Sequence, residues 1–150
     1  MQEFKVLMVD DEEDFVKTLA ERMQMRDLAP QTALSGEQAL QQVQEDVPDV
    51  MVLDLKMPGI DGMEVLRRVR KAYPQVQVVI LTGHGSEKYR TEALRLGAFA
   101  YLNKPVEMEQ LVKTLKDAYK RKLEQAMVAA AFAEEGEFGT AQEIMDEKNK

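Results

Sequence analysis

Residues 76–81 read VQVVIL, an almost unbroken run of β-branched and aliphatic side chains. Similar runs occur at residues 4–9 (FKVLMV) and 50–53 (VMVL). Strands with apolar side chains at nearly every position are typical of parallel sheets, because helices cover both faces of such sheets. These three segments therefore predict strands of a parallel sheet.

Two further segments complete a set of five predicted strands. Residues 99–102 (FAYL) form a short candidate. Residues 28–34 (LAPQTAL) contain Pro30, which has no backbone N–H to donate and therefore favours the edge of a sheet. With this second strand at an edge, the strand order 2-1-3-4-5 is the natural choice.

Amphipathic helical patterns separate the strands. In the first, Phe15, Leu19 and Met23 recur every four residues. The later helices combine inward-facing aliphatic residues with candidate start signals: Leu40 and Val43 after Ser35, Leu66 and Val69 after Asp61, a fourth helix after Ser86, and Leu111, Val112 and Leu115 after Pro105. Alternating strands and helices predict an α/β, flavodoxin-like (βα)5 three-layer domain.

The C-terminal segment has a different pattern. Residues 122–150 contain no strand signal and carry three lysines against seven acidic residues, a charge of −4. We therefore expect a domain of residues 1–121 followed by an acidic helical C-terminal extension of residues 122–150, too short and too acidic to hold a DNA-binding domain.

Helix propensity within this extension stays high up to Glu135. We expect the fifth helix to continue, or a new one to start, near Lys122, with a turn at residues 136–139 and a short last helix. An unbroken helix over residues 107–135 would be about 43 Å long. Such a helix must break or project from the domain toward a partner.

The bulk composition excludes several classes of protein. A formal net charge of −7 disfavours general binding to nucleic-acid backbones or to anionic membranes. The chain has no cysteine, which excludes disulfides and thiolate chemistry and fits a cytoplasmic location. The N-terminus lacks a signal-peptide pattern, and the longest apolar run, residues 126–133, is far shorter than the roughly 20 residues that cross a bilayer.

Polar residues follow four of the predicted strands. Asp10 and Asp11 follow the first, Asp54 the third, Thr82 ends the fourth, and Lys104 follows the fifth. Ligands of open parallel sheets bind beyond the carboxyl ends of the strands, where the strand order reverses. We therefore expect these side chains to meet at one edge of the sheet.

This set of side chains suits phosphoryl transfer. Clustered carboxylates repel one another unless a cation intervenes, and Mg²⁺ favours one or two carboxylates together with phosphate oxygens. Lys104 supplies a positive charge and Thr82 a hydroxyl donor. A nucleophile, a metal ion and fixed donors are the parts that phosphoryl transfer requires.

Four separated motifs resemble the receiver domains of two-component response regulators. They are VDD at residues 9–11, LDLKMPGIDG at 53–62, LTG at 81–83 and YLNKP at 101–105. The resemblance covers residues 3–121, and the motifs occur in the family's order. Gly83 departs from the pattern, since family members more often have alanine there, and this change is expected to loosen the loop.

The resemblance implies a role for each site residue. Asp54 would be the phospho-acceptor, and Lys104 would pair with the phosphoryl group. Asp10, Asp11 and Asp54 would hold Mg²⁺ together with the backbone carbonyl of Lys56.

A conformational switch is implied as well. Thr82 would hydrogen-bond the phosphoryl group, and Tyr101 would move inward as Thr82 shifts, altering the face formed by the fourth helix, the fifth strand and the fifth helix. The Lys104–Pro105 bond is usually cis in this family. The residues at positions 56 and 84, here Lys56 and His84, influence how long the acyl phosphate survives.

The implied partners are a sensor histidine kinase or phosphotransfer protein as donor and an unknown downstream protein. A homodimer through the extension is a further possibility, whereas direct DNA binding and membrane association are not expected. Because the chemistry acts only on the protein itself, through self-phosphorylation and autodephosphorylation, we expect a switch and not an enzyme.

Two other functions remain open at this point. A Mg²⁺-dependent phosphohydrolase with an aspartyl nucleophile would need an acid two residues after Asp54, where this chain has Lys56. A flavin-binding domain of the same topology would need a Ser/Thr/Gly-rich loop after the first strand, where this chain has the acidic residues 10–14.

Overall fold

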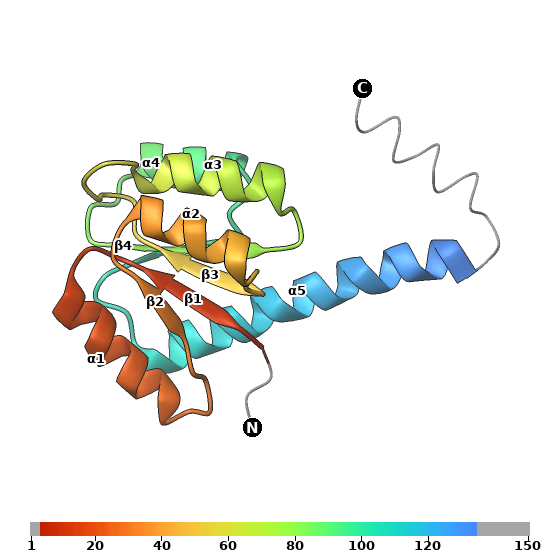
Figure 1. Ribbon diagram of the computed structural model, residues 1–150, viewed down its shortest axis with the longest axis horizontal. Coiled ribbons are helices and arrows are strands. Elements are labelled where there is room, and N and C mark those ends of the chain that lie inside the picture. The colour runs from red at the N-terminus through yellow and green to blue at the C-terminus, as the bar shows by residue number, and fades with distance from the viewer. Residues whose placement is uncertain (1–3, 135–150) are drawn as a thin grey trace.

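The computed structural model describes residues 4–134 (Figure 1). Five strands alternate with five helices in this part of the chain: β1 (Val6–Val9), α1 (Glu13–Gln24), β2 (Gln31–Ala33), α2 (Gly36–Glu45), β3 (Val50–Leu53), α3 (Gly62–Ala72), β4 (Gln77–Thr82), α4 (Glu87–Arg95), β5 (Ala100–Asn103) and α5 (Met108–Glu134). No helix within residues 4–134 is both long and apolar enough to cross a bilayer. The turn expected at residues 136–139 and the last short helix lie outside the described residues.

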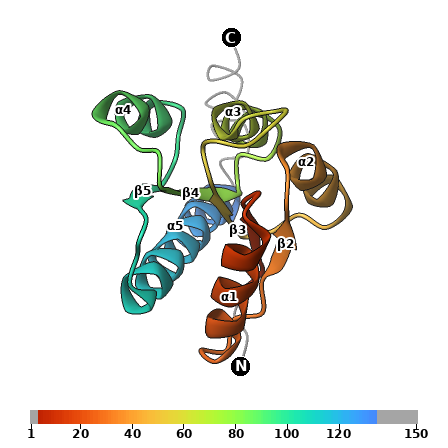
Figure 2. The same cartoon turned by 90° about the vertical axis from the view of Figure 1, so that its left-hand side faces the viewer.

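The strands form one parallel sheet in the order β2-β1-β3-β4-β5, which confirms the predicted order. Figure 2 shows α1 and α5 on one face of the sheet and α2, α3 and α4 on the other. The flavodoxin-like three-layer architecture is therefore confirmed. β2 begins directly after Pro30 and lies at the edge, as the proline requires.

Burial on both faces explains why the strands are apolar at nearly every position. In β3, Met51 and Leu53 pack on the side of α2 and α3, whereas Val50 and Val52 pack on the side of α1 and α5. Successive side chains of a strand point to opposite faces, so a sheet with two cores needs apolar residues throughout. The first polar residue after this run is Asp54, at the point where β3 leaves the core.

The three predicted helix caps are present. In each case the side chain accepts a hydrogen bond from the backbone N–H three residues further on: Ser35 from Gln38 (3.1 Å), Asp61 from Glu64 (3.0 Å) and Ser86 from Tyr89 (3.2 Å). Each cap satisfies one of the N–H groups that a helix start leaves without a partner. The caps thus fix where α2, α3 and α4 begin.

The fifth helix continues through Lys122 without a break, so the boundary suggested at residue 121 lies inside α5. Its first half buries Leu111 and Leu115 against the sheet. The next turns stay attached through an ion pair between Lys122 and Asp49 and a hydrogen bond of 3.4 Å between the side chains of Gln77 and Gln125. Beyond that point α5 projects from the domain (Figure 1).

Candidate functional site

Backbone hydrogen bonds position the predicted site residues at the carboxyl ends of the strands. The N–H of Asp54 donates to the carbonyl of Val9 (3.0 Å), and the N–H of Lys104 donates to the carbonyl of Thr82 (2.9 Å). Both bonds extend the pairing of the sheet by one residue past its strands. Asp10, Asp54 and Lys104 therefore follow their strands at the same carboxyl edge of the sheet, as expected, with Lys104 somewhat further beyond the edge than Asp54.

The ammonium group of Lys104 lies among three carboxylates. Its Nζ is 2.5 Å from Oδ2 of Asp10, 3.2 Å from Oε1 of Glu12 and 3.8 Å from Oδ2 of Asp54. The ammonium also lies 4.2 Å from the centre of the Phe15 ring, at the start of α1. Contacts with a ring face and with several carboxylates hold the Lys104 side chain in one position.

The two central carboxylates are buried. Asp54 is 2% exposed and Asp10 is 4% exposed. Oδ1 of Asp54 is buried without a hydrogen-bond partner in the described part of the chain. Asp10 and Asp54 outnumber the one ammonium group in this poorly hydrated place, and the more exposed Glu12 adds further negative charge, an arrangement that favours a cation.

The pKa values of the central pair follow from this environment. Burial raises the pKa of the Asp10 carboxyl, against the opposing effects of Lys104 and of the Glu12 N–H. Burial also opposes the charge of Lys104, but the hydrogen bond and charge of Asp10, together with Asp54 and Glu12, outweigh it, so the pKa of Lys104 is raised. Lys104 therefore remains an ammonium group at neutral pH.

The oxygens of this cluster suit a small divalent cation. Carboxylate oxygens of Asp10, Glu12 and Asp54 all lie within 4.8 Å of one another. Hard oxygen ligands and the unpartnered Oδ1 of Asp54 fit Mg²⁺, which keeps several water ligands of its own. Asp11, expected from the sequence as a ligand, is exposed and is not one of these three residues.

Glu12 and Phe15 are site residues that the sequence did not reveal. The N–H of Glu12 donates to Oδ1 of Asp10 (2.9 Å), and this local bond turns the chain so that the Glu12 side chain reaches back to Lys104. Their signal in the sequence was weak, because acidic residues are common at helix starts and Phe15 fits the apolar face of α1.

Thr82 and Tyr101 are joined by the loop after β4. The buried Thr82 accepts a hydrogen bond at Oγ1 from the N–H of His84 (3.2 Å). The N–H of Ser86 donates to the hydroxyl of Tyr101 (3.3 Å). A Cβ atom on Gly85 would collide with the side-chain oxygens of Asn103 and Tyr101, so a larger residue there would require these two side chains to move.

Gly83, in the same loop, is under no such constraint. A Cβ atom there would meet only Lys104 carbons, at 3.7 Å or more, which is ordinary contact. The alanine that the resemblance leads one to expect at this position would therefore fit. The Lys104–Pro105 bond that follows β5 is cis, as expected from the resemblance.

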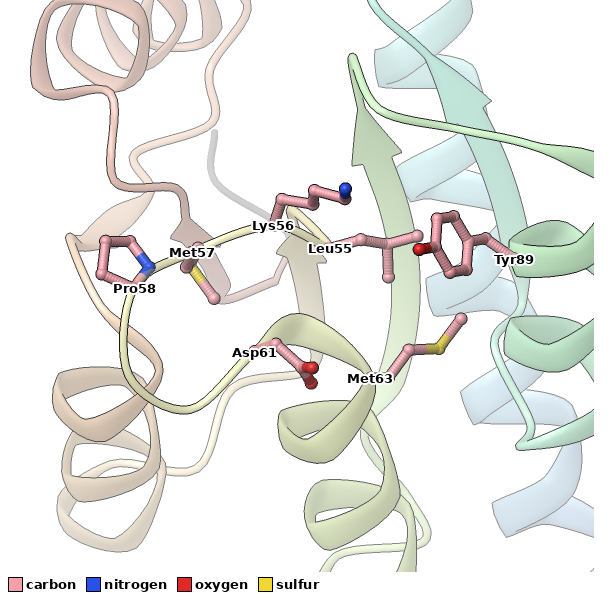
Figure 3. Close-up of a pocket in the computed structure, with 7 residues that line it drawn as sticks. All are labelled: Leu55, Lys56, Met57, Pro58, Asp61, Met63 and Tyr89. Carbon is pink, nitrogen blue, oxygen red and sulfur yellow. The ribbon is translucent and has the colours of Figure 1, made fainter.

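Lys56, whose backbone carbonyl was expected to bind a metal, directs its side chain elsewhere. Its Nζ lies 5.9 Å from the centre of the Tyr89 ring on α4. Lys56 and Tyr89 line a cleft of about 410 Å³, and Figure 3 shows both side chains facing it. The cleft is lined by Leu55, Lys56, Met57, Pro58, Asp61, Met63 and Tyr89.

Comparisons with known proteins give a consistent result. A family model described as the response regulator receiver domain matches residues 6–116. An NtrX-like response regulator from Rickettsia typhi is 33% identical over 120 residues, which are 79% of this chain and 25% of that protein. The chain thus spans about a quarter of the length of such curated relatives.

Solved structures agree with the sequence matches. A response regulator receiver domain from Clostridium thermocellum is 35% identical with a TM-score of 0.75, covering 79% of this chain and 95% of that one. NtrX from Brucella abortus, solved in complex with ADP, is 25% identical with a TM-score of 0.82, covering 91% of this chain and 30% of that one.

The buried negative charge leads to a prediction about stability. Replacing Asp54 by asparagine removes one of the mutually repelling carboxylates, so the free energy of unfolding in EDTA should rise by roughly 1–3 kcal/mol. The matched control is Asp117→Asn on the exposed side of α5, which should change stability by no more than about 0.5 kcal/mol. Urea unfolding measures both. A clear loss of stability in Asp54→Asn would mean that its pairing with Lys104 outweighs the repulsion.

Proposed function

Because this chain belongs to the response-regulator receiver family of two-component signalling, we propose that it is a phosphorylation switch in which Asp54 is the phosphoryl acceptor. The observation that carries this proposal is the convergence of Asp54, Asp10 and Lys104 at the carboxyl edge of the sheet. One carboxylate there is buried, unpartnered at one oxygen and 3.8 Å from an ammonium group.

Asp54 has the features of an acceptor. Its Oδ1 has no hydrogen-bond partner among the described residues, so its lone pairs are not committed. In the transfer step this carboxylate forms a bond to phosphorus while the phosphorus–nitrogen bond of a phosphohistidine breaks. The electron pair of that bond stays on the ring nitrogen, and a histidine protonated at its other nitrogen leaves as neutral imidazole.

Lys104 and Thr82 then hold the transferred group. The ammonium group of Lys104 is near enough to Asp54 to pair with a phosphoryl oxygen, exchanging its contact with Glu12 for a stronger one. Oγ1 of Thr82 already accepts a hydrogen bond from His84, so its own proton is available to donate to a second phosphoryl oxygen.

Asp10, Asp11 and Asp54, together with the backbone carbonyl of Lys56, are the residues we assign to holding Mg²⁺. When bound, the ion supplies the positive charge that offsets the phosphoryl oxygens and the carboxylates. The burial of Asp10 and Asp54 and the unpartnered Oδ1 of Asp54 support a cation here, whereas the assignment of Asp11 and of the Lys56 carbonyl rests on the family resemblance.

The loop after β4 connects Thr82, which we place beside the phosphoryl group on Asp54, with Tyr101. Thr82 and Tyr101 each share a hydrogen bond with this loop, through His84 and Ser86, so a shift of Thr82 toward the phosphoryl group changes the support of Tyr101. A change in the packing of Tyr101 then alters the surface formed by α4, β5 and α5. Phosphorylation in this way biases a two-state equilibrium.

The chemistry is confined to the protein itself. Lys56 occupies the position where an aspartyl phosphohydrolase carries its second acidic residue, so the enzyme alternative lacks the carboxyl group that serves as general acid. We propose a cytoplasmic switch that receives its phosphoryl group from a histidine kinase or phosphotransfer protein and acts on a protein partner. The net charge of −7 argues against DNA contacts by these 150 residues.

Phosphorylation by a small donor tests the acceptor. With acetyl phosphate and Mg²⁺, the wild-type chain should gain the mass of one phosphoryl group, and Asp54→Asn should gain none, because an amide cannot form the acyl phosphate. Intact-protein mass spectrometry measures the gain, with Asp117→Asn as the control that keeps the site. Equal labelling of Asp54→Asn and wild type would contradict the assignment, and many turnovers per chain on a phosphate ester would favour the hydrolase.

Magnesium titration distinguishes the acidic residues after β1. If Asp11 is a ligand, Asp11→Asn should weaken Mg²⁺ binding about tenfold, a loss of about 1.4 kcal/mol. Glu12→Gln, which changes a carboxylate paired with Lys104, should change the affinity by less than about threefold. Isothermal titration calorimetry gives both dissociation constants. The reverse ranking would transfer the ligand role from Asp11 to Glu12.

A further inference from the structure

The last turns of α5 extend beyond the contacts that attach this helix to the domain. Lys122 pairs with Asp49, and Gln125 bonds to Gln77 at the amino-terminal end of β4. From residue 123 to residue 134 every side chain is exposed. The end of the helix is therefore aimed in a fixed direction by the domain but is not covered by it (Figure 1).

This exposed part is apolar on every side. Residues 126–133 read AMVAAAFA, eight apolar residues in succession. Met127 is 69% exposed, Val128 58% and Phe132 39%. A helix that is hydrophobic all round is normally buried, and an unpacked helical end of this length is only marginally stable in water. Another surface is therefore needed to cover it.

The charges flanking this apolar segment indicate what that surface is. Lys120 lies seven residues before Met127 and Glu134 seven residues after it, both exposed. Seven residues are close to two helical turns, so all three lie on one face, with Leu123 and Ala131 between them. The face is basic at one end, apolar in the middle and acidic at the other end.

We propose that a second copy of this chain covers the projecting part of α5, forming an antiparallel helix pair centred on Met127. In this arrangement Lys120 of each chain lies opposite Glu134 of the other, and Leu123 lies opposite Ala131. A parallel pair would instead oppose Lys120 to Lys120 and Glu134 to Glu134. Charge complementarity thus selects the antiparallel arrangement.

The dimensions of the pair indicate a weak dimer. The segment from Lys120 to Glu134 is about 21 Å long, at about 1.5 Å per residue. Two helices in contact over this length bury less surface than the roughly 1,200 Å² of the smallest standard interfaces. A dissociation constant in the micromolar range is therefore expected. The pairing needs neither Asp54 nor a phosphoryl group. A result that disproves the pairing therefore leaves the proposed function unaffected, and a result that disproves the proposed function leaves the pairing unaffected.

Charge exchange in the 150-residue chain tests the arrangement. Lys120→Glu and Glu134→Lys should each weaken self-association about tenfold, because each change places two pairs of like charges in contact. Combining both changes in one chain, or mixing the two single variants, should restore self-association, because Lys and Glu then face each other again. Sedimentation velocity over about 1–200 μM measures dimerisation, in the micromolar range where weak pairs form. Lys88→Glu on α4, an exposed lysine changed in the same way, should have no effect.

Cysteine cross-linking supplies an independent readout, since the natural chain has no cysteine. An equimolar mixture of Leu123→Cys and Ala131→Cys chains should form mainly the mixed disulfide on mild oxidation. Disulfides between identical variants would show a parallel pair and overturn the proposal. A wild-type chain that stays monomeric throughout the concentration range would overturn it too, as would a dimer unaffected by Met127→Glu.

Discussion

One ammonium group has to balance three carboxylates at the carboxyl edge of the sheet, and this constraint determines much of the structure around it. Lys104 contacts Asp10 and Glu12 and lies within ion-pair distance of Asp54. The balance is incomplete, because the negative charges outnumber the positive one and Oδ1 of Asp54 has no partner in the described chain. An apolar sheet with two covered faces keeps Asp10 and Asp54 away from bulk water, so the site favours any group that brings positive charge or uses the free carboxylate oxygen.

The sequence predicted the fold and the core of the site because both depend on local patterns. Continuous apolar strands indicate burial on both faces, and the carboxyl ends of parallel strands meet at one edge. Asp10, Asp54, Thr82 and Lys104 each come at or directly after such a run, so their convergence follows from strand order alone. The caps at Ser35, Asp61 and Ser86 could also be predicted from the sequence, since each cap needs only its own side chain and a backbone N–H three residues further on.

The sequence did not predict the features that depend on the direction of the chain after a strand. Glu12 reaches Lys104, and Asp11 does not, because Asp10 accepts a hydrogen bond from the Glu12 N–H and turns the backbone at that point. Strand order says nothing about this turn. The sequence also left undecided whether α5 continues past Lys122 in one piece. Helix propensity allowed it to continue, but the contacts with Asp49 and Gln77 that attach it to the domain come from segments far apart in the sequence. Tertiary contacts decided both outcomes.

A structure of the chain with beryllofluoride and Mg²⁺ shows whether Lys104 exchanges a carboxylate for a phosphoryl oxygen on Asp54. If this exchange occurs, beryllium bonds to Asp54, Nζ of Lys104 and Oγ1 of Thr82 each lie within hydrogen-bond distance of a fluorine atom, and Glu12 is released from Lys104. Beryllofluoride on another carboxylate, or a Lys104 that still contacts Asp10 and Glu12 and no fluorine, would contradict it.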